Sequence, residues 1–280
     1  MKSARFIAVM LALAGCAAPN LSTRQAEPYS AGTRLVTLAP SLTEIAFAIG
    51  CSSDVVADTS YDDFPPQAAR LPHVADLVHV DVERLAALRP TAVIALHDQE
   101  REGAQIDSKF DLPIAYLPNR RLDDLYADVS GVGRACRQTK AARALIGSMR
   151  TRIARAARRA ARFGHRPTVL YLLGLPGFTV GENSYLNDLI KLAGGSNVAG
   201  AVDQPYPNLS AEAIAAADPD IIIVSRSVNF GPDVRGRPPW NALRAVRSGR
   251  VLRPPNDDIL ERLGPRVVDG FEWLVRVLHS

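Results

Sequence analysis

The chain has 280 residues, 47% of them hydrophobic and 22% charged, with a formal net charge of +4. This composition is that of a soluble globular protein, and the length is sufficient for two lobes with separate cores. The positive net charge does not indicate nucleic-acid binding. The cations are mostly arginines concentrated on one predicted helix, and no aromatic residues lie between them to stack on bases.

The first residues have the pattern of a secretory signal. Lys2 and Arg5 precede an apolar stretch, residues 6–14, of roughly nine residues, which is too short to span a membrane. The run Leu-Ala-Gly-Cys ending at Cys16 resembles the bacterial lipobox, in which the cysteine receives a diacylglycerol and becomes the mature N-terminus. Cleavage as an ordinary signal two residues later is the alternative. We expect the signal segment, residues 1–16, to be cleaved just before its last residue, and an exported lipoprotein to be anchored through Cys16 to a bacterial membrane, periplasmic or at the cell surface.

Residues 17–33 contain Pro, Ser and Gly without periodicity, which predicts a flexible tether. From residue 34 onwards, short β-rich runs alternate with helical patterns. In the first half, strands are expected at 35–38, 55–56, 92–96 and 114–117, and helices at 41–49, 82–88 and 122–135. In the second half, the same alternation of β-rich runs and helical patterns occupies 168–173, 186–192, 211–217, 221–225 and 251–253, before a closing helix at 265–278. This alternation predicts a mostly parallel sheet in each half.

The two halves share a further pattern. Glu83 stands seven residues before Pro90, and Glu212 stands seven residues before Pro219; each proline is followed by an apolar strand. Proline ends a helix because it lacks the backbone donor that the helix needs. Both halves therefore have the order glutamate, helix, proline, strand, which suggests two similar lobes.

One long amphipathic helix is predicted to join these lobes. Residues 139–163 place apolar side chains at intervals of three to four, with cations around the remaining surface, and Gly164 ends the pattern. Such a helix is about 35 Å long. We expect lobes at 34–138 and 165–280, joined by a linking helix at 139–164, and a cleft that closes only slightly because a packed helix resists hinge bending.

Two cysteines remain in the mature chain, Cys51 and Cys136, both in the first lobe. Thiols in an oxidising compartment can form a disulfide. Two separate buried thiols fit the sequence equally well, because spacing along the chain does not show whether the Cα atoms lie within reach.

Five blocks in order carry a family resemblance. They are Leu-Ala-Pro-Ser-Leu-Thr-Glu at 38–44, Ser-Tyr-Asp-Asp-Phe-Pro-Pro-Gln-Ala at 60–68, residues 83–95, Phe-Thr-Val-Gly at 178–181, and Glu261-Arg262 with Pro265-Arg266. With them the chain resembles substrate-binding proteins of ABC importers, in the helical-backbone group that binds metal chelates, and most closely the periplasmic cobalamin-binding proteins. The resemblance covers nearly all of residues 34–278.

The resemblance implies a fold and a mode of action. The fold is α/β, with two lobes that each have a mostly parallel central sheet flanked by helices, joined by one long rigid helix, as in class III periplasmic binding proteins. A monomer captures its ligand between the lobes without catalysis or a cofactor. It then delivers the ligand to a permease dimer, which is driven by a cytoplasmic ATPase.

The resemblance also implies ligand-binding positions. These are Pro40, Ser41 and Tyr61 in the first lobe and Phe178, Tyr206, Asp258 and Arg262 in the second. Aromatic rings suit the apolar faces of a corrin, whereas charged groups suit its polar rim. Leu77 and Leu96 stand where similar corrinoid-binding proteins often have tryptophan. Cobinamide, haem or a ferric siderophore are therefore alternatives to cobalamin.

Two histidines and two glutamates complete the candidate residues. His79 and His97 are weak candidates for ligating a chelated metal, and solvated loop histidines are the simpler interpretation. The resemblance implies that Glu83 and Glu212 meet arginines of the permease, one glutamate per lobe. Two glutamates stabilised by helix dipoles are the alternative.

Other classes of function have less support. The sequence has no His-Glu-x-x-His zinc motif, no Gly-x-Ser-x-Gly elbow and no phosphate loop. The adjacent acids at 62–63 and 257–258 could act as an acid and a base, but such pairs in loops usually form turns. A purely structural envelope lipoprotein would account for the anchor and not for the two lobes.

Overall fold

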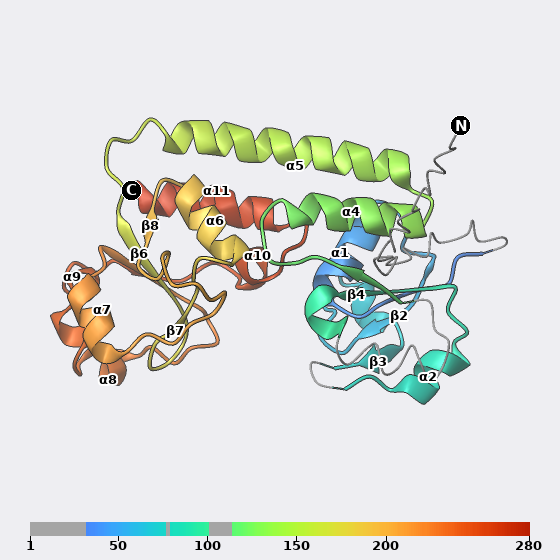
Figure 1. Ribbon diagram of the computed structural model, residues 1–280, viewed down its shortest axis with the longest axis horizontal. Coiled ribbons are helices and arrows are strands. Elements are labelled where there is room, and N and C mark those ends of the chain that lie inside the picture. The colour runs from blue at the N-terminus through green and yellow to red at the C-terminus, as the bar shows by residue number, and fades with distance from the viewer. Residues whose placement is uncertain (1–31, 77–78, 101–113) are drawn as a thin grey trace, which may run out of the picture.

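The computed structural model describes residues 32–76, 79–100 and 114–280. Within these ranges the chain forms two α/β lobes, and the helix α5 (Thr139–Ala160) runs along one side of both (Figure 1). The predicted lipidation site Cys16, most of the predicted tether and Leu77 lie outside the described residues. None of the described helices combines the length and apolar character needed to cross a membrane.

The first lobe contains a five-stranded sheet in the order β3-β2-β1-β4-β5, with every pairing parallel. Its strands are β1 (Leu35–Thr37), β2 (Val55–Thr59), β3 (His73–Ala75), β4 (Ala92–Leu96) and β5 (Ile114–Leu117). Its described helices are α1 (Pro40–Ala48), α2 (Val82–Ala87) and α4 (Asp124–Ala135), with short 3₁₀ turns at Ala68–Arg70 and His97–Gln99. Leu35 and Ile94 pack on one face, and Val36 and Val93 on the other. Both faces of this sheet are covered, so the sequence of an inner strand such as β4 is a continuous apolar run and does not alternate with polar residues.

The second lobe contains a sheet in the order β10-β9-β6-β7, and β8 also pairs with β6. The strands are β6 (Thr168–Gly174), β7 (Phe178–Thr179), β8 (Ser196–Asn197), β9 (Ile221–Val224) and β10 (Val251–Leu252), and only the pairing of β6 with β7 is antiparallel. The helices are α6 (Tyr185–Leu192), α7 (Ala211–Ala217), α8 (Pro232–Arg235), α9 (Arg244–Arg247), α10 (Asp258–Glu261) and α11 (Val267–Leu278), with a 3₁₀ turn at Trp240–Ala242. The predicted two-lobed α/β class is confirmed. The short strands β3, β7 and β8 were not predicted from the sequence.

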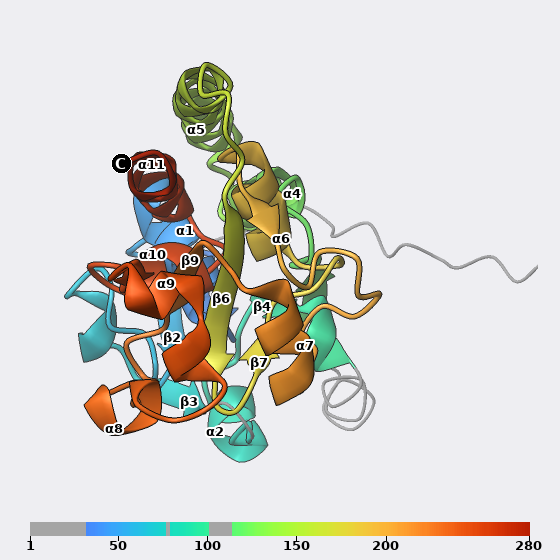
Figure 2. The same ribbon diagram turned by 90° about the vertical axis from the view of Figure 1, so that its left-hand side faces the viewer.

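One apolar core extends through both lobes. α5 packs on α4 of the first lobe and on α11 of the second, and Figure 2 shows it as the outermost layer above these helices. Met149 and Ile153 of α5 belong to the same buried cluster as Leu35 in β1 and Phe271 in α11. Arg152 adds ion pairs to α11, with N–O distances of 2.6 Å to Asp269 and 2.8 Å to Glu272. The orientation of the lobes therefore rests on continuous packing.

A disulfide joins Cys51, just after α1, to Cys136 at the end of α4. Their Cα atoms are 6.0 Å apart, and 85 positions separate them in the sequence. Both residues are buried in the first lobe. Of the two possibilities that the sequence left open, the structure has the bonded one.

Replacing both cysteines by serine should lower the free energy of unfolding by about 2–5 kcal/mol, because the bond closes a long loop in the unfolded chain. Urea denaturation with and without a thiol reductant measures the effect. The reductant should destabilise the native protein and leave the double variant unchanged. Equal stability of the oxidised native protein and the variant would contradict this expectation.

Candidate functional site

The carboxyl ends of the parallel strands face the junction between the lobes. β1 leads into Pro40 and Ser41 at the start of α1, and β2 leads into the loop that carries Tyr61. Ser41 is buried where the second lobe approaches closely: a Cβ added to Gly264 would lie 3.6 Å from the Ser41 Cα and 3.3 Å from a Glu44 carboxylate oxygen. A ligand site at the carboxyl ends of strands is usual in open α/β sheets.

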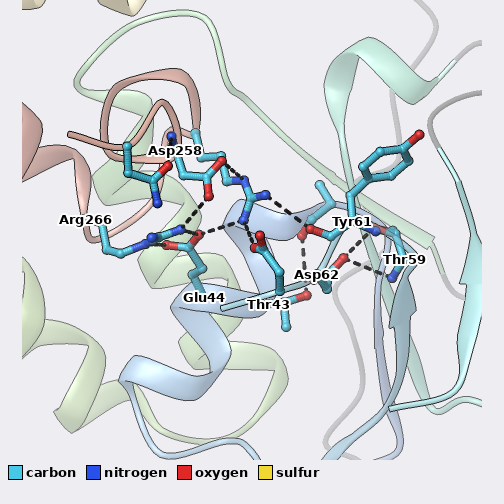
Figure 3. A network of polar contacts seen from close by, with 11 residues as sticks. Thr43, Glu44, Thr59, Tyr61, Asp62, Asp258 and Arg266 are labelled. Atoms are coloured by element: carbon cyan, nitrogen blue, oxygen red, sulfur yellow. Dashed lines mark hydrogen bonds and ion pairs between the residues drawn. The ribbon is translucent and has the colours of Figure 1, made fainter. Parts of the chain in front are cut away.

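A buried carboxylate from the first lobe accepts hydrogen bonds from two arginines of the second. The side chain of Glu44 is 2% exposed. Arg266 binds it in a bidentate manner, with N–O distances of 2.9 and 2.5 Å, and the Arg262 Nη1 lies 3.4 Å from its Oε1. In Figure 3 the side chains of Glu44, Arg266 and Asp258 converge at this point. Such an enclosed pair is favourable only when its charges are matched and hydrogen-bonded.

Arg262 extends this network across the junction. It donates to the Asp63 carboxylate at 2.6 Å and to the Tyr61 carbonyl oxygen at 3.2 Å, and its Nε lies 3.0 Å from Asp258. Arg266 lies 3.6 Å from Asp258 and 4.0 Å above the Phe64 ring. Asp258 and Arg262 were expected to contact the rim of a ligand. The structure shows their polar groups engaged between the lobes, and ligand contact stays a prediction.

Changing Glu44 to Gln should lower the free energy of unfolding by about 3 kcal/mol, because two guanidinium groups then lose their buried counter-charge. The matched control is Asp63→Asn in the same network, where the carboxylate is 64% exposed. That change should cost less than about 1 kcal/mol, since water screens exposed pairs. Urea denaturation of both variants measures the difference, and equal losses would contradict the assignment of Glu44 as the central charge.

Exposed aromatic side chains form the second part of the site. Tyr61 and Tyr206 retain 46% and 41% of their accessible surface. The rings of Tyr206 and Phe178 lie 6.3 Å apart at 46°, and Figure 3 shows the Tyr61 ring pointing away from the ion-pair network. Partial burial raises the pKa of Tyr206, and the carboxylates of Asp98 and Glu261 raise it further. Asp98 follows β4 of the first lobe, so Tyr206 lies near both lobes.

Of the positions predicted to contact a ligand or its metal, the structure also describes Leu96, His97 and His79 in the first lobe. Leu96 is half-buried at the end of β4. The His97 Nδ1 lies 2.9 Å from Glu100 on the same loop, and His79 has an 82% exposed side chain, 3.9 Å from Asp76. Neither histidine is buried, as the simpler interpretation of solvated loop residues requires.

The adjacent acids 62 and 63 do not act as a pair. Asp62 is buried and accepts hydrogen bonds from the backbone N–H and hydroxyl of Thr59, whereas Asp63 is exposed and bound to Arg262. Close by, the Asp58 carboxylate lies 2.7 Å from the His73 Nδ1, and burial raises the pKa of Asp58 to about 7. These contacts stabilise the loop that carries Tyr61.

Sequence reasoning gave no role to Glu44, Arg266 or Glu261. A signal was present for Glu44, because it is the one charge in the otherwise uncharged run of α1, and a buried charge needs a partner. The partners lie more than 200 positions away, beyond the reach of any local pattern. A hollow of about 650 Å³ also adjoins the network, lined by Glu44, Phe47, Phe64, Pro265 and Arg266 among others. It does not include the exposed tyrosines.

Glu261 is near enough to Tyr206 for its charge to raise the pKa of that tyrosine. It accepts a hydrogen bond from the buried Tyr171 hydroxyl at 3.1 Å. Burial, together with the negative charges of Asp257 and Asp258, raises its pKa to about 7. The charge of this part of the site therefore changes near neutral pH.

The raised pKa of Glu261 should make stability depend on pH. An unfolded glutamate titrates near pH 4.3, so between about pH 4.5 and 7 the folded state holds more protons and loses stability as pH rises. Relative to the native protein, Glu261→Gln should gain about 1–3 kcal/mol between pH 4.5 and 8. Urea denaturation across this range measures it, with Glu182→Gln as the exposed control. Parallel stability curves for the native protein and Glu261→Gln would contradict the shift.

Glu83 and Glu212 occupy equivalent places in the two lobes. They lie exposed in the first turns of α2 and α7, after the N-caps Asp81 and Ser210. Hydrogen bonds from its own backbone and from Ser210 lower the pKa of Glu212. Figure 1 shows α2 and α7 on the side of the lobes opposite α5.

Comparison with known proteins gives concordant results. The vitamin B12-binding protein of Yersinia pestis is 28% identical over 255 residues, which cover 90% of this chain and 89% of that protein. The structure of the periplasmic heme-binding protein BhuT in complex with two hemes has a TM-score of 0.79 and 25% identity, covering 89% of this chain and 98% of that one. The periplasmic vitamin B12 binding protein BtuF of Vibrio cholerae has a TM-score of 0.74 and 26% identity, covering 88% and 96%. The family model described as periplasmic binding protein matches residues 35–257, and the chain therefore belongs to that family.

Proposed function

We propose that this protein captures a corrinoid, cobalamin-like metal chelate between its lobes and delivers it to the permease of an ABC importer. The observation that carries the proposal is the set of partly exposed aromatic residues, Tyr61 from one lobe and Phe178 with Tyr206 from the other, at the junction of a periplasmic binding protein fold. The similarity to vitamin B12-binding proteins supports the choice of ligand.

The chemistry of the junction suits a large planar chelate. Aromatic rings cover apolar ligand faces, and a few polar groups fix the ligand's orientation. Leu96 is smaller than an aromatic residue, so the first lobe offers a thinner wall than tryptophan would. The polar groups nearby are those of Glu261, Asp98 and the Tyr206 hydroxyl.

A haem is the second candidate ligand. It is favoured by the structural similarity to a haem-binding protein, which has the higher TM-score of the two compared structures. Haem also presents flat apolar faces, and its iron accepts an axial ligand. His97 is the candidate for that role on the first lobe, although its Nδ1 is near Glu100.

We further propose that the protein is an exported monomer held to a bacterial membrane through Cys16. A tether confines the receptor near its permease and so raises the local concentration of loaded protein. Metabolic labelling with a fatty acid tests the anchor, and Cys16→Ser should abolish labelling.

Calorimetry against cobalamin, cobinamide, haem and a ferric siderophore tests the ligand. Cobalamin is expected to bind most tightly, and Tyr206→Ala should weaken binding about tenfold through loss of the aromatic contact. Tyr126→Ala is the control, because the Tyr126 ring, on α4, packs against Arg150 of α5 and is not one of the exposed aromatic residues of the site. Tighter haem binding would favour the second candidate. If none of the four ligands binds, the proposal of a metal-chelate ligand is wrong and only the assignment of the fold remains.

The placement of Glu83 and Glu212 supports a docking role. The two helices that carry them lie on one side of the molecule, opposite α5, so both carboxylates could meet a single flat partner (Figure 1). A carboxylate and a guanidinium group form a bidentate pair that fixes orientation. The proposed partner is therefore a permease surface with one arginine cluster for each lobe.

Reversing both charges, Glu83→Lys with Glu212→Lys, should abolish ligand uptake by cells and leave ligand affinity within about twofold, because repulsion replaces the docking pairs. Asp123→Lys with Asp203→Lys, two exposed acids elsewhere, should retain uptake. Uptake of labelled ligand and calorimetry measure the two quantities. An equal fall in affinity and uptake would contradict the docking role.

A further inference from the structure

The cations of this chain are concentrated in one segment. Residues 134–166 contain eleven Lys and Arg residues and no Asp or Glu, whereas the rest of the chain contains 22 cations and 29 carboxylates. The net charge of +4 therefore combines +11 on this segment with −7 on the remainder. α5 forms most of the segment, and seven of its 22 residues are cationic.

The outer face of α5 carries small side chains as well as cations. Its buried residues, Met149 and Ile153 among them, face α4 and α11. Half a turn away, small residues follow at helical spacing: Ala144, Gly147, Thr151 and Ala154. Lys140, Arg155 and Arg158 share this outer half, and Figure 2 shows no other described element above it.

Most of these cations have no acidic partner. Arg152 and Arg155 pair with Glu272, and Arg150 lies 4.5 Å above the Tyr126 ring. In the part of the chain that the structure describes, no carboxylate forms an ion pair with Arg134, Arg137, Lys140, Arg143, Arg158, Arg159 or Arg162, and all seven are exposed.

A merely solvated helix would not need this pattern. Acidic residues four positions from an arginine stabilise a helix, and like charges at that spacing destabilise it. Arg155 with Arg159, and Arg158 with Arg162, place like charges four positions apart. Cations recur along the whole of α5, a helix of about 33 Å. An external negative surface would offset the repulsion between them.

We propose that the outer face of α5 binds the anionic headgroups of a phospholipid membrane. A straight row of small residues flanked by long arginines fits a flat surface, because the backbone approaches closely while the guanidinium groups reach phosphates on both sides. The face has no bulky apolar residues for insertion, so the contact is peripheral and sensitive to salt. Aromatic residues between the cations, which would stack on bases of a nucleic acid, are missing from α5.

This contact would orient the molecule. With α5 on a membrane, α2 and α7 point away from that membrane (Figure 1), so this contact and docking to a permease in the same membrane exclude each other. α5 contains none of the aromatic residues of the ligand site, so the proposed lipid binding does not depend on the proposed ligand.

Pelleting with phosphatidylglycerol vesicles tests the proposal, with phosphatidylcholine vesicles for comparison. The protein is the chain from Ala17 onwards, which contains every described helix and strand and none of the predicted signal. The test variant carries Arg143→Gln, Arg158→Gln, Arg159→Gln and Arg162→Gln. The control variant removes the same charge elsewhere, through Arg70→Gln, Arg84→Gln, Arg235→Gln and Arg237→Gln.

Phosphatidylglycerol vesicles should bind the native chain and release it as salt is raised. The test variant should bind at least about 100-fold more weakly, since each cation at an anionic surface contributes about fivefold. The control variant should stay within about threefold. Equal losses in both variants, equal binding to phosphatidylcholine, or tighter binding to duplex DNA at the same salt concentration would overturn the proposal.

Discussion

The ion pair between the buried Glu44 and the guanidinium groups of Arg262 and Arg266 is the interaction on which the junction of the lobes depends. A carboxylate with 2% exposure in one lobe is stable only if the other lobe supplies its counter-charge at the right place. Arg262 is in turn held by Asp63 and by the carbonyl of Tyr61, so the loop with the exposed tyrosine is positioned by the same contact. The same contact therefore contributes to lobe orientation, together with the packing of α5 on both lobes, and to the geometry of the site.

The fold could be predicted from the sequence because its signals are local. The strands β4 and β9 are apolar runs, α5 has a clear helical period, and prolines mark the ends of two helices. The site was harder to predict from the sequence. Glu44 and Arg266 lie in motifs that could be recognised, yet their contact joins residues 222 positions apart. Leu77 and the lipidation site Cys16 fall outside the described residues and stay predictions.

Charge separates the molecule into two parts with different surroundings. The ligand junction is rich in carboxylates, and the pKa of Glu261 is raised to about 7 mainly because that group is buried near other acids. The opposite side, along α5, is almost purely cationic. A protein with an acidic junction and a basic helix along one side has an uneven charge distribution, and its orientation near charged surfaces is therefore not random.

The continuous core has a consequence for how the chain can be divided. Two-lobed proteins often consist of domains that fold alone, with boundaries that few contacts cross. Here α5 supplies apolar side chains to the interiors of both lobes, and the cluster runs from Leu35 to Leu278. Separate expression of either half would expose part of that interior to water. Split reporters, domain swaps and inserted fusion partners should therefore be placed in exposed turns such as residues 247–249 between α9 and β10, and not at the boundary between the lobes.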